Sequence, residues 1–269
     1  MAELVRPDGA TIHYEVIGSG ETLLCLGGWG SFCHGNTGGL PFGLTDRYRV
    51  VIMDYRGVGG STDTPDVPAT MDMYADDAIA ILDAIGGRPT HLLGMVGIGA
   101  CVTQCIAIRR PDLARSLVNT GAWCKMDALL AEHLRLFLEV HRTCGWATFQ
   151  RMVCALSFEE SYYLANAHRL VGPQGPWSEI RGRIDTHARF IDASLAHDVE
   201  AALGSVQTPA MILHAPLDIV CGPRTTLPIE AALPNARGAS IEGAAHVMAG
   251  KAIRQRFSDL LFGFYGELD

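Results

Sequence analysis

A glycine-rich turn between a buried strand and a helix is a common place for an enzyme to present a nucleophile. Residues 91–100, HLLGMVGIGA, have this pattern: an apolar run, then closely spaced glycines and the start of a helical period. In the G-x-S-x-G form of the turn a serine stands in the middle, but here Met95, Val96 and Gly97 follow Gly94. None of these side chains can attack a carbonyl carbon, so we expect no covalent catalysis from this turn.

Other reactive side chains are scattered along the chain. His133 and His141 stand 8 residues apart in a helical pattern, which is two turns and too far for one zinc site. The 8 cysteines include no C-x-x-C pair, and we expect reduced, mostly buried thiols. The sequence therefore predicts neither a metal nor a cofactor.

Composition narrows the classes of partner. The chain has 269 residues and a net charge of -8, with no basic run of five or more residues, so nucleic acid is not an expected partner. No apolar stretch is long enough to span a bilayer, and the first residues show no secretory pattern. We expect a cytoplasmic protein that binds a small-molecule substrate, contacts no membrane and is either a monomer or a homodimer.

The elements that must position any site follow from the hydrophobic pattern. A hairpin is predicted around Pro7-Asp8-Gly9, and apolar runs of strand length occur at 22–28, 48–54, 90–96, 116–122 and 209–215. Helical periods lie between them, at 73–85, 100–109, 226–233 and 252–264. This alternation predicts an α/β fold with a mostly parallel sheet flanked by helices.

Residues 125–205 break this alternation. They are mostly helical in pattern and contain no convincing strand. We interpret 1–124 and 206–269 as the core and 125–205 as an inserted helical cap. Such a cap would cover the carboxyl ends of the strands, where open α/β sheets bind ligands.

Four segments resemble motifs of the α/β-hydrolase superfamily and occur along the chain in the order expected for that family. Together they extend over nearly the whole chain. DYRGVGGST (54–62) fits the D-x-R-G-x-G-x-S turn of that family, and LGGWG (26–30) stands where the family has its oxyanion loop. LHAPLDIVCGP (213–223) and IEGAAHVM (241–248) resemble the loops that present its acid and its histidine. The resemblance implies an α/β-hydrolase fold with Asp218 as the acid and His246 as the base.

The missing serine limits what this resemblance implies. A His246–Asp218 pair can still act as an oriented general base, and backbone N–H groups of Gly28, Trp29 and Gly97 could stabilise an oxyanion. Expected pocket residues are Val96, Met95, His34 and Trp123. In elbow and cap the chain loosely resembles the aminoacrylate hydrolase of pyrimidine breakdown, another relative whose elbow lacks serine.

The backbone of the turn is a separate question. The family's nucleophile has positive φ, where a β-branched residue such as Val96 is strained by about 1–3 kcal/mol. Gly97 can adopt positive φ without steric cost. We therefore expect Gly97 to form the sharp turn and the elbow to be reshaped.

Three functions remain open. The first is a cofactor-free hydrolase in which the base activates water against a labile carbonyl, imine or enamine. The second is a cofactor-free lyase, decarboxylase or oxygenase that uses the same histidine, favoured by a pocket with no room for water. The third is a non-catalytic binding protein on a hydrolase fold, favoured by a pocket closed by side chains.

Overall fold

The apolar runs of the sequence form the strands of one eight-stranded sheet. The structure, a computed structural model, describes residues 2–268. The strand order is β1-β2-β4-β3-β5-β6-β7-β8, with antiparallel pairing from β1 to β2 and from β2 to β4 and parallel pairing elsewhere. The strands are β1 (Ala2–Val5), β2 (Thr11–Ile17), β3 (Glu21–Leu26), β4 (Tyr48–Met53), β5 (Thr90–Met95), β6 (Ala114–Thr120), β7 (Ala210–His214) and β8 (Ala236–Ser240).

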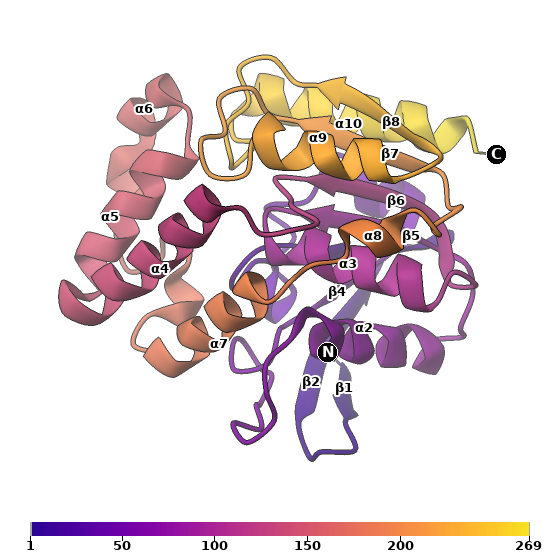
Figure 1. The fold of residues 1–269 in the computed structure, drawn as a ribbon, viewed down its shortest axis with the longest axis horizontal. Coiled ribbons are helices and arrows are strands. Elements are labelled where there is room, and N and C mark those ends of the chain that lie inside the picture. The colour runs from indigo at the N-terminus through magenta and orange to yellow at the C-terminus, as the bar shows by residue number, and fades with distance from the viewer. Residues whose placement is uncertain (1, 269) are drawn as a thin grey trace.

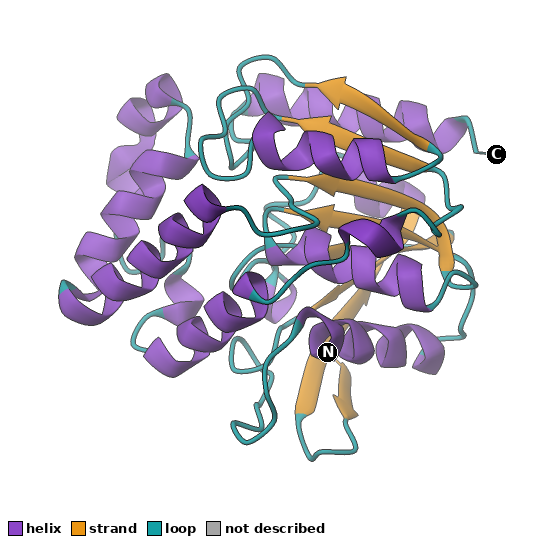
Figure 2. Ribbon diagram, in the orientation of Figure 1, coloured by secondary structure: helices purple, strands orange, loops and turns teal. Residues whose placement is uncertain are grey.

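Helices cover both faces of this sheet, as Figures 1 and 2 show. Along β3, Leu24 and Leu26 pack into one buried cluster while Leu23 and Cys25 pack into the other, because successive side chains of a strand point to opposite faces. Both faces are therefore buried, as the continuous apolar runs predict. The helices of the core are α1 (Leu44–Arg47), α2 (Met71–Ala84), α3 (Ile98–Arg109), α8 (Glu200–Leu203), α9 (Pro223–Ala232) and α10 (Lys251–Gly266).

Four further helices form the cap between β6 and β7, whereas α8, which the predicted cap of 125–205 included, packs against α9 and α3 of the core. The four cap helices are α4 (Ala128–Thr143), α5 (Gly145–Ser157), α6 (Glu160–Leu170) and α7 (Ile184–Leu195). In Figure 1 they lie to the left, at the end of the sheet toward which the arrows of β7 and β8 point. A backbone hydrogen bond of 2.8 Å from Val199 to Cys124 closes the base of this excursion. The cap therefore stands over the carboxyl edge of the strands.

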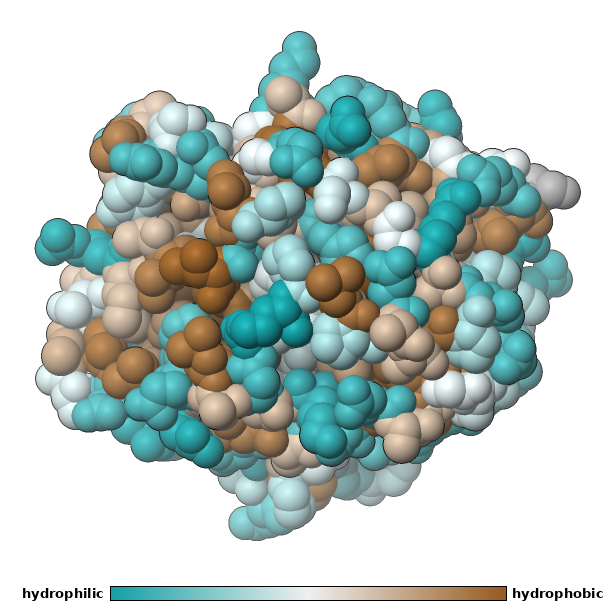
Figure 3. All heavy atoms as spheres, turned by 45° about the horizontal axis from the view of Figure 1, so that its top comes forward, coloured by the Kyte–Doolittle hydropathy of each residue, from teal (hydrophilic) through white to brown (hydrophobic). Residues whose placement is uncertain are grey.

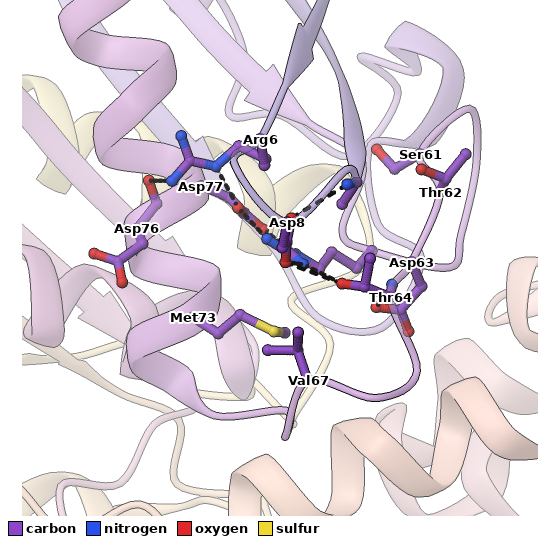
Figure 4. Close-up of polar contacts among 12 residues, drawn as sticks. Arg6, Asp8, Ser61, Thr62, Asp63, Thr64, Val67, Met73, Asp76 and Asp77 are labelled. Carbon is purple, nitrogen blue, oxygen red and sulfur yellow. Dashed lines mark hydrogen bonds and ion pairs between the residues drawn. The ribbon is translucent and has the colours of Figure 1, made fainter.

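The turn DYRGVGGST has a structural role. The Arg56 guanidinium donates to both carboxylate oxygens of Asp77 in α2, at 2.7 and 2.8 Å, and also bonds to Asp8 in the β1–β2 hairpin. Arg6 donates to Asp77 at 2.9 Å (Figure 4). The hydrogen bond from Arg56 lowers the pKa of Asp8 to about 2. This cluster of charges fastens the hairpin to α2.

The face of the molecule that Figure 3 draws has no single dominant apolar area. In Figure 3 the apolar side chains form several small patches among hydrophilic ones. None of the helices within residues 2–268 has the length and apolar character that a membrane crossing requires. The large exposed apolar side chains are Val5, Val16, Leu129, Leu136, Leu164, Leu217, Ile219 and Leu227.

Candidate active site

Asp218 and His246 meet at the carboxyl edge of the sheet. Asp218 lies in the loop after β7, and His246 lies in the loop between β8 and α10. His246 Nδ1 is 2.9 Å from Asp218 Oδ2, although the two residues are 28 positions apart. The Asp218 side chain is 0% exposed and that of His246 is 10% exposed. The predicted pair is therefore formed, and only the histidine reaches accessible space.

The surroundings of Asp218 keep its carboxylate charged. Burial alone raises the pKa of Asp218, but the neighbouring His246 and the backbone N–H groups of Cys221 and Val220 outweigh it, so the pKa lies below the usual value. Both N–H groups donate to Oδ1 at 2.8 Å, which leaves Oδ2 for the histidine. A charged Asp218 favours the His246 tautomer with the proton on Nδ1. That tautomer leaves Nε2 free to accept a proton.

The turn after β5 differs from the expected one. Val96 has a φ of 52° and Gly97 a φ of 73°, so two successive residues have positive φ. The expectation that Gly97 alone would form the turn is wrong, because Val96 shares it despite a strain of about 1–3 kcal/mol. Two backbone hydrogen bonds hold this geometry: Val96 donates to Thr120 at 2.9 Å and Gly97 donates to Gly121 at 2.7 Å.

Two glycines fix the register of this turn. A Cβ on Gly94 would lie 2.4 Å from the Cα of Ala100, and one on Gly99 would lie 2.3 Å from the carbonyl oxygen of Leu26. Both positions thus require glycine for close packing of α3 against the sheet. Four residues separate these glycines, whereas G-x-S-x-G has three. Counting back from Gly99 as the last glycine of G-x-S-x-G places Gly97 at the serine position, whereas counting forward from Gly94 places Val96 there.

Gly121 brings the turn beside the acid–base pair. A Cβ at this position would lie 3.5 Å from the Cα of Val96, 3.6 Å from His246 Nδ1 and 3.7 Å from Asp218 Oδ2. A side chain here would therefore separate the turn from the histidine. With φ of 58°, Gly121 has a backbone conformation that also favours glycine.

The predicted oxyanion donors need one correction. The Gly97 N–H is already donated to Gly121, so it is not free to bind an oxyanion. Ile98 is the first residue of α3, and the first N–H groups of a helix have no partner within the helix. Ile98 lines the same cavity as Gly28 and Trp29. Within residues 2–268, no hydrogen bond is found from the N–H of Trp29 or Ile98.

A cavity of about 40 Å³ lies between this turn, His246 and the cap. The predicted residues Val96 and Trp123 line it, and the predicted Met95 lines a wider neighbouring cleft of about 840 Å³. The two spaces share Gly28, Trp29, Val96 and Trp177. The full lining of the cavity is Gly28, Trp29, Val96, Gly97, Ile98, Trp123, Leu134, Phe137, Val153, Ser157, Trp177, Val220, Cys221 and His246.

The prediction that His34 lines the pocket is wrong. Its side chain is 60% exposed, and its Nε2 lies 3.5 Å from a carboxylate oxygen of Glu179. It is absent from the lining of both the cavity and the cleft. The loop turns outward here, because Phe32 and His34 both have positive φ and the His34 N–H is held by Asp54.

The sequence analysis missed the part of the lining that the cap supplies. Leu134 and Phe137 come from α4, Val153 and Ser157 from α5, and Trp177 from the loop after α6. The helical period of α4 and α5 marks an apolar face but does not indicate what that face covers. Cys221 also lines the cavity, but burial raises its pKa well above the usual value, so it is a neutral thiol.

A family model and curated relatives agree with this geometry. The model described as "alpha/beta hydrolase fold" matches residues 21–250, and the chain therefore belongs to the alpha/beta hydrolase fold family. A protein named "Putative carbamate hydrolase RutD" from Azorhizobium caulinodans is 24% identical over 267 residues, covering 97% of both chains. The protein of that name from Stutzerimonas stutzeri is 27% identical and covers 87% of this chain and 89% of its own length. The expectation of a hydrolase-family enzyme is confirmed.

Solved structures support the same fold. A hydrolase from Pseudomonas aeruginosa superposes with a TM-score of 0.81 at 25% identity and covers 98% of both chains. The enol-lactonase from Burkholderia xenovorans has a TM-score of 0.85 at 16% identity, covering 98% of this chain and all (100%) of its own. At that identity the second likeness shows the fold alone.

Proposed function

We propose that this protein is a cofactor-free hydrolase of small molecules in which His246, oriented by Asp218, activates water against a labile carbonyl, imine or enamine. The observation that carries the proposal is the 2.9 Å contact between His246 Nδ1 and Asp218 in a site whose turn offers no nucleophile. The curated relatives named for carbamate hydrolysis support a small-molecule substrate.

The reaction needs one proton carrier. His246 Nε2 takes a proton from water while the water oxygen bonds to the electrophilic carbon. The negative charge that develops on the substrate oxygen is stabilised by the N–H groups of Trp29 and Ile98. The protonated imidazole, held by Asp218, then returns the proton to the leaving group as the bond to carbon breaks.

This machinery suits labile substrates only. In the serine-protease template, binding and oxyanion stabilisation alone retain about 10³–10⁴-fold of rate enhancement after a member of the triad is removed. Such a factor is adequate for an enol ester, imine or enamine and inadequate for an ordinary amide. A cavity of about 40 Å³ has room for an ordered water molecule, which needs about 10–15 Å³ on the same measure. This room favours hydrolysis over the alternatives of a lyase without water or a closed binding fold.

His246→Ala tests the proposal, with His34→Ala as the matched control. Both replace a histidine, but only His246 lines the cavity. On a panel of enol esters, imines and enamines we expect His246→Ala to lower turnover at least about 10³-fold. His34→Ala should retain turnover, and both variants should melt near the wild-type temperature. Full activity of His246→Ala would refute the general-base role, and lost stability with retained activity would indicate that this histidine serves packing.

A further inference from the structure

We infer that the cavity beside His246 selects a compact, uncharged and mainly apolar group of the substrate. Ser157 offers this group its one side-chain hydroxyl contact. Carboxylate and carbamate anions are rejected from the cavity. The inference rests on the proposed function, since it describes the part of the substrate next to the carbon that water attacks. It concerns specificity, which the acid–base pair does not determine.

The walls of the cavity are apolar. Leu134, Phe137 and Val153 from the cap are all 3% exposed or less, and the tryptophans Trp29, Trp123 and Trp177 complete the wall. Among the described residues, no Lys, Arg, Asp or Glu lines the cavity. An anion placed here would lose its hydration without gaining a cation, and it would approach the charged Asp218 behind His246. A neutral group meets neither penalty.

Two polar groups interrupt this wall: the hydroxyl of Ser157 and the buried indole N–H of Trp123, which has no hydrogen-bond partner among the described residues. Ser157 is the one that lies beside the histidine loop. It is the last residue of α5 and is 1% exposed. Its backbone oxygen accepts a hydrogen bond of 2.8 Å from Val247, the residue after His246, so the serine is held beside the histidine loop. Ser157 lines the cavity, and no hydrogen bond within residues 2–268 involves its hydroxyl. Because buried hydroxyls are normally paired, an oxygen or nitrogen of a ligand in the cavity is the natural partner.

The wider cleft accommodates the remainder of the substrate. Two cationic residues, Lys251 and Arg254, and one acidic residue, Glu179, line it, so its charged lining is cationic on balance. The cleft meets the cavity at Gly28, Trp29, Val96 and Trp177. Charged side chains therefore lie outside the cavity and uncharged ones inside it. A substrate that carries an anionic end binds with that end in the cleft and its uncharged end toward His246.

Matched esters test this selection. Vinyl benzoate and vinyl 4-carboxybenzoate share the labile bond, since hydrolysis of either consumes one water and releases the acid and acetaldehyde. We expect kcat/KM to be at least about 100-fold higher for the neutral ester. Ser157→Ala should lower kcat/KM about tenfold for at least one of the three vinyl hydroxybenzoates while changing vinyl benzoate less than about twofold. Ser194→Ala is the control: Ser194 is a buried cap serine that bonds to Phe190 and lies outside the cavity.

A binding experiment separates this inference from the proposed function. Benzamide and 4-carboxybenzamide are titrated into His246→Ala by calorimetry. Binding of the neutral amide alone supports the inference even if no ester is hydrolysed, in which case only the proposed function fails. Turnover or binding that favours the anionic member of either pair overturns the inference and leaves the general-base mechanism standing. The inference is also overturned if neither amide binds. It is overturned as well if Ser157→Ala has equal effects on vinyl benzoate and all hydroxybenzoates.

Discussion

Two substitutions could restore a serine to the turn after β5, and we expect them to behave differently. Gly97→Ser should create measurable esterase activity, whereas Val96→Ser should remain a poor esterase. The reason is the register: Gly97 occupies the position two residues before Gly99, where the serine of G-x-S-x-G would stand. In that motif one oxyanion donor is the N–H of the residue after the nucleophile.

The size of the difference follows from the hydrogen bonds. After Val96→Ser the next N–H is that of Gly97, which is donated to Gly121 at 2.7 Å. Loss of one oxyanion donor costs about 10²–10³ in kcat. After Gly97→Ser the next N–H is that of Ile98, which begins α3. A Cβ at position 97 has room, since its nearest neighbours are Trp123 ring carbons at 3.7 and 3.8 Å. Its positive φ of 73° costs about 1–3 kcal/mol of stability.

Turnover of p-nitrophenyl acetate and labelling by a fluorophosphonate measure the outcome. The wild type should not be labelled, and Val96→Ala controls for loss of the valine side chain. We expect Gly97→Ser to exceed Val96→Ser about 100-fold in kcat and to be labelled at position 97. If Val96→Ser is the faster esterase, the turn has the ordinary register and the reasoning from Gly94 and Gly99 is wrong.

Three further outcomes are expected. Asp218→Asn should lower kcat by up to about 10⁴-fold, because the amide favours the wrong histidine tautomer, and steady-state kinetics on the best substrate of the panel checks this. Arg56→Met should lower the free energy of unfolding in urea by at most about 3 kcal/mol, because buried Asp77 loses its bidentate partner and keeps the single bond from Arg6. Burial lowers the pKa of His187 to about 3, below its usual value of about 6.5, so stability present above pH 6.5 is lost as the pH falls toward 3. The contribution of His187 to this loss is about 2 kcal/mol at pH 5, so urea titrations at pH 7 and pH 5 should show a smaller loss in His187→Phe, while His141 and His197, whose pKa values burial also lowers, still contribute.

The strands of the core were predictable because a strand that is buried on both faces has a continuous run of apolar residues. The run at 90–96 became β5, all of whose residues are buried. The segment at 236–240, ARGAS, was missed and is β8. It is an edge strand that pairs only with β7 and is half exposed, so it has neither a continuous apolar run nor a clear alternation.

The acid–base pair was predictable and the detail of the turn was not. Asp218 follows a recognisable strand end, and His246 stands in a segment that resembles the histidine loop of the family; the fold brings them to 2.9 Å. The sequence alone does not decide whether Val96 or Gly97 stands in the serine position. The glycines that the packing requires are defined by tertiary contacts. Gly99 is identified only by its approach to Leu26 on β3. Likewise, the outward turn of His34 depends on the hydrogen bond from its backbone N–H to the Asp54 carboxylate. The spacing of His34 from Trp29 in the sequence does not indicate this bond.

The cap separates the question of mechanism from that of substrate. The proposed base and its acid come from the loops after β7 and β8, which the family resemblance identifies. Leu134, Phe137, Val153 and Ser157 come from cap helices. A hydrogen bond from Val247 to Ser157 joins the two parts directly beside His246. A change in α5 can therefore alter which group lies against the base without altering the base. At 24–27% identity to the RutD relatives cited above, a shared mechanism does not imply a shared substrate, and an apolar cavity favours a neutral one.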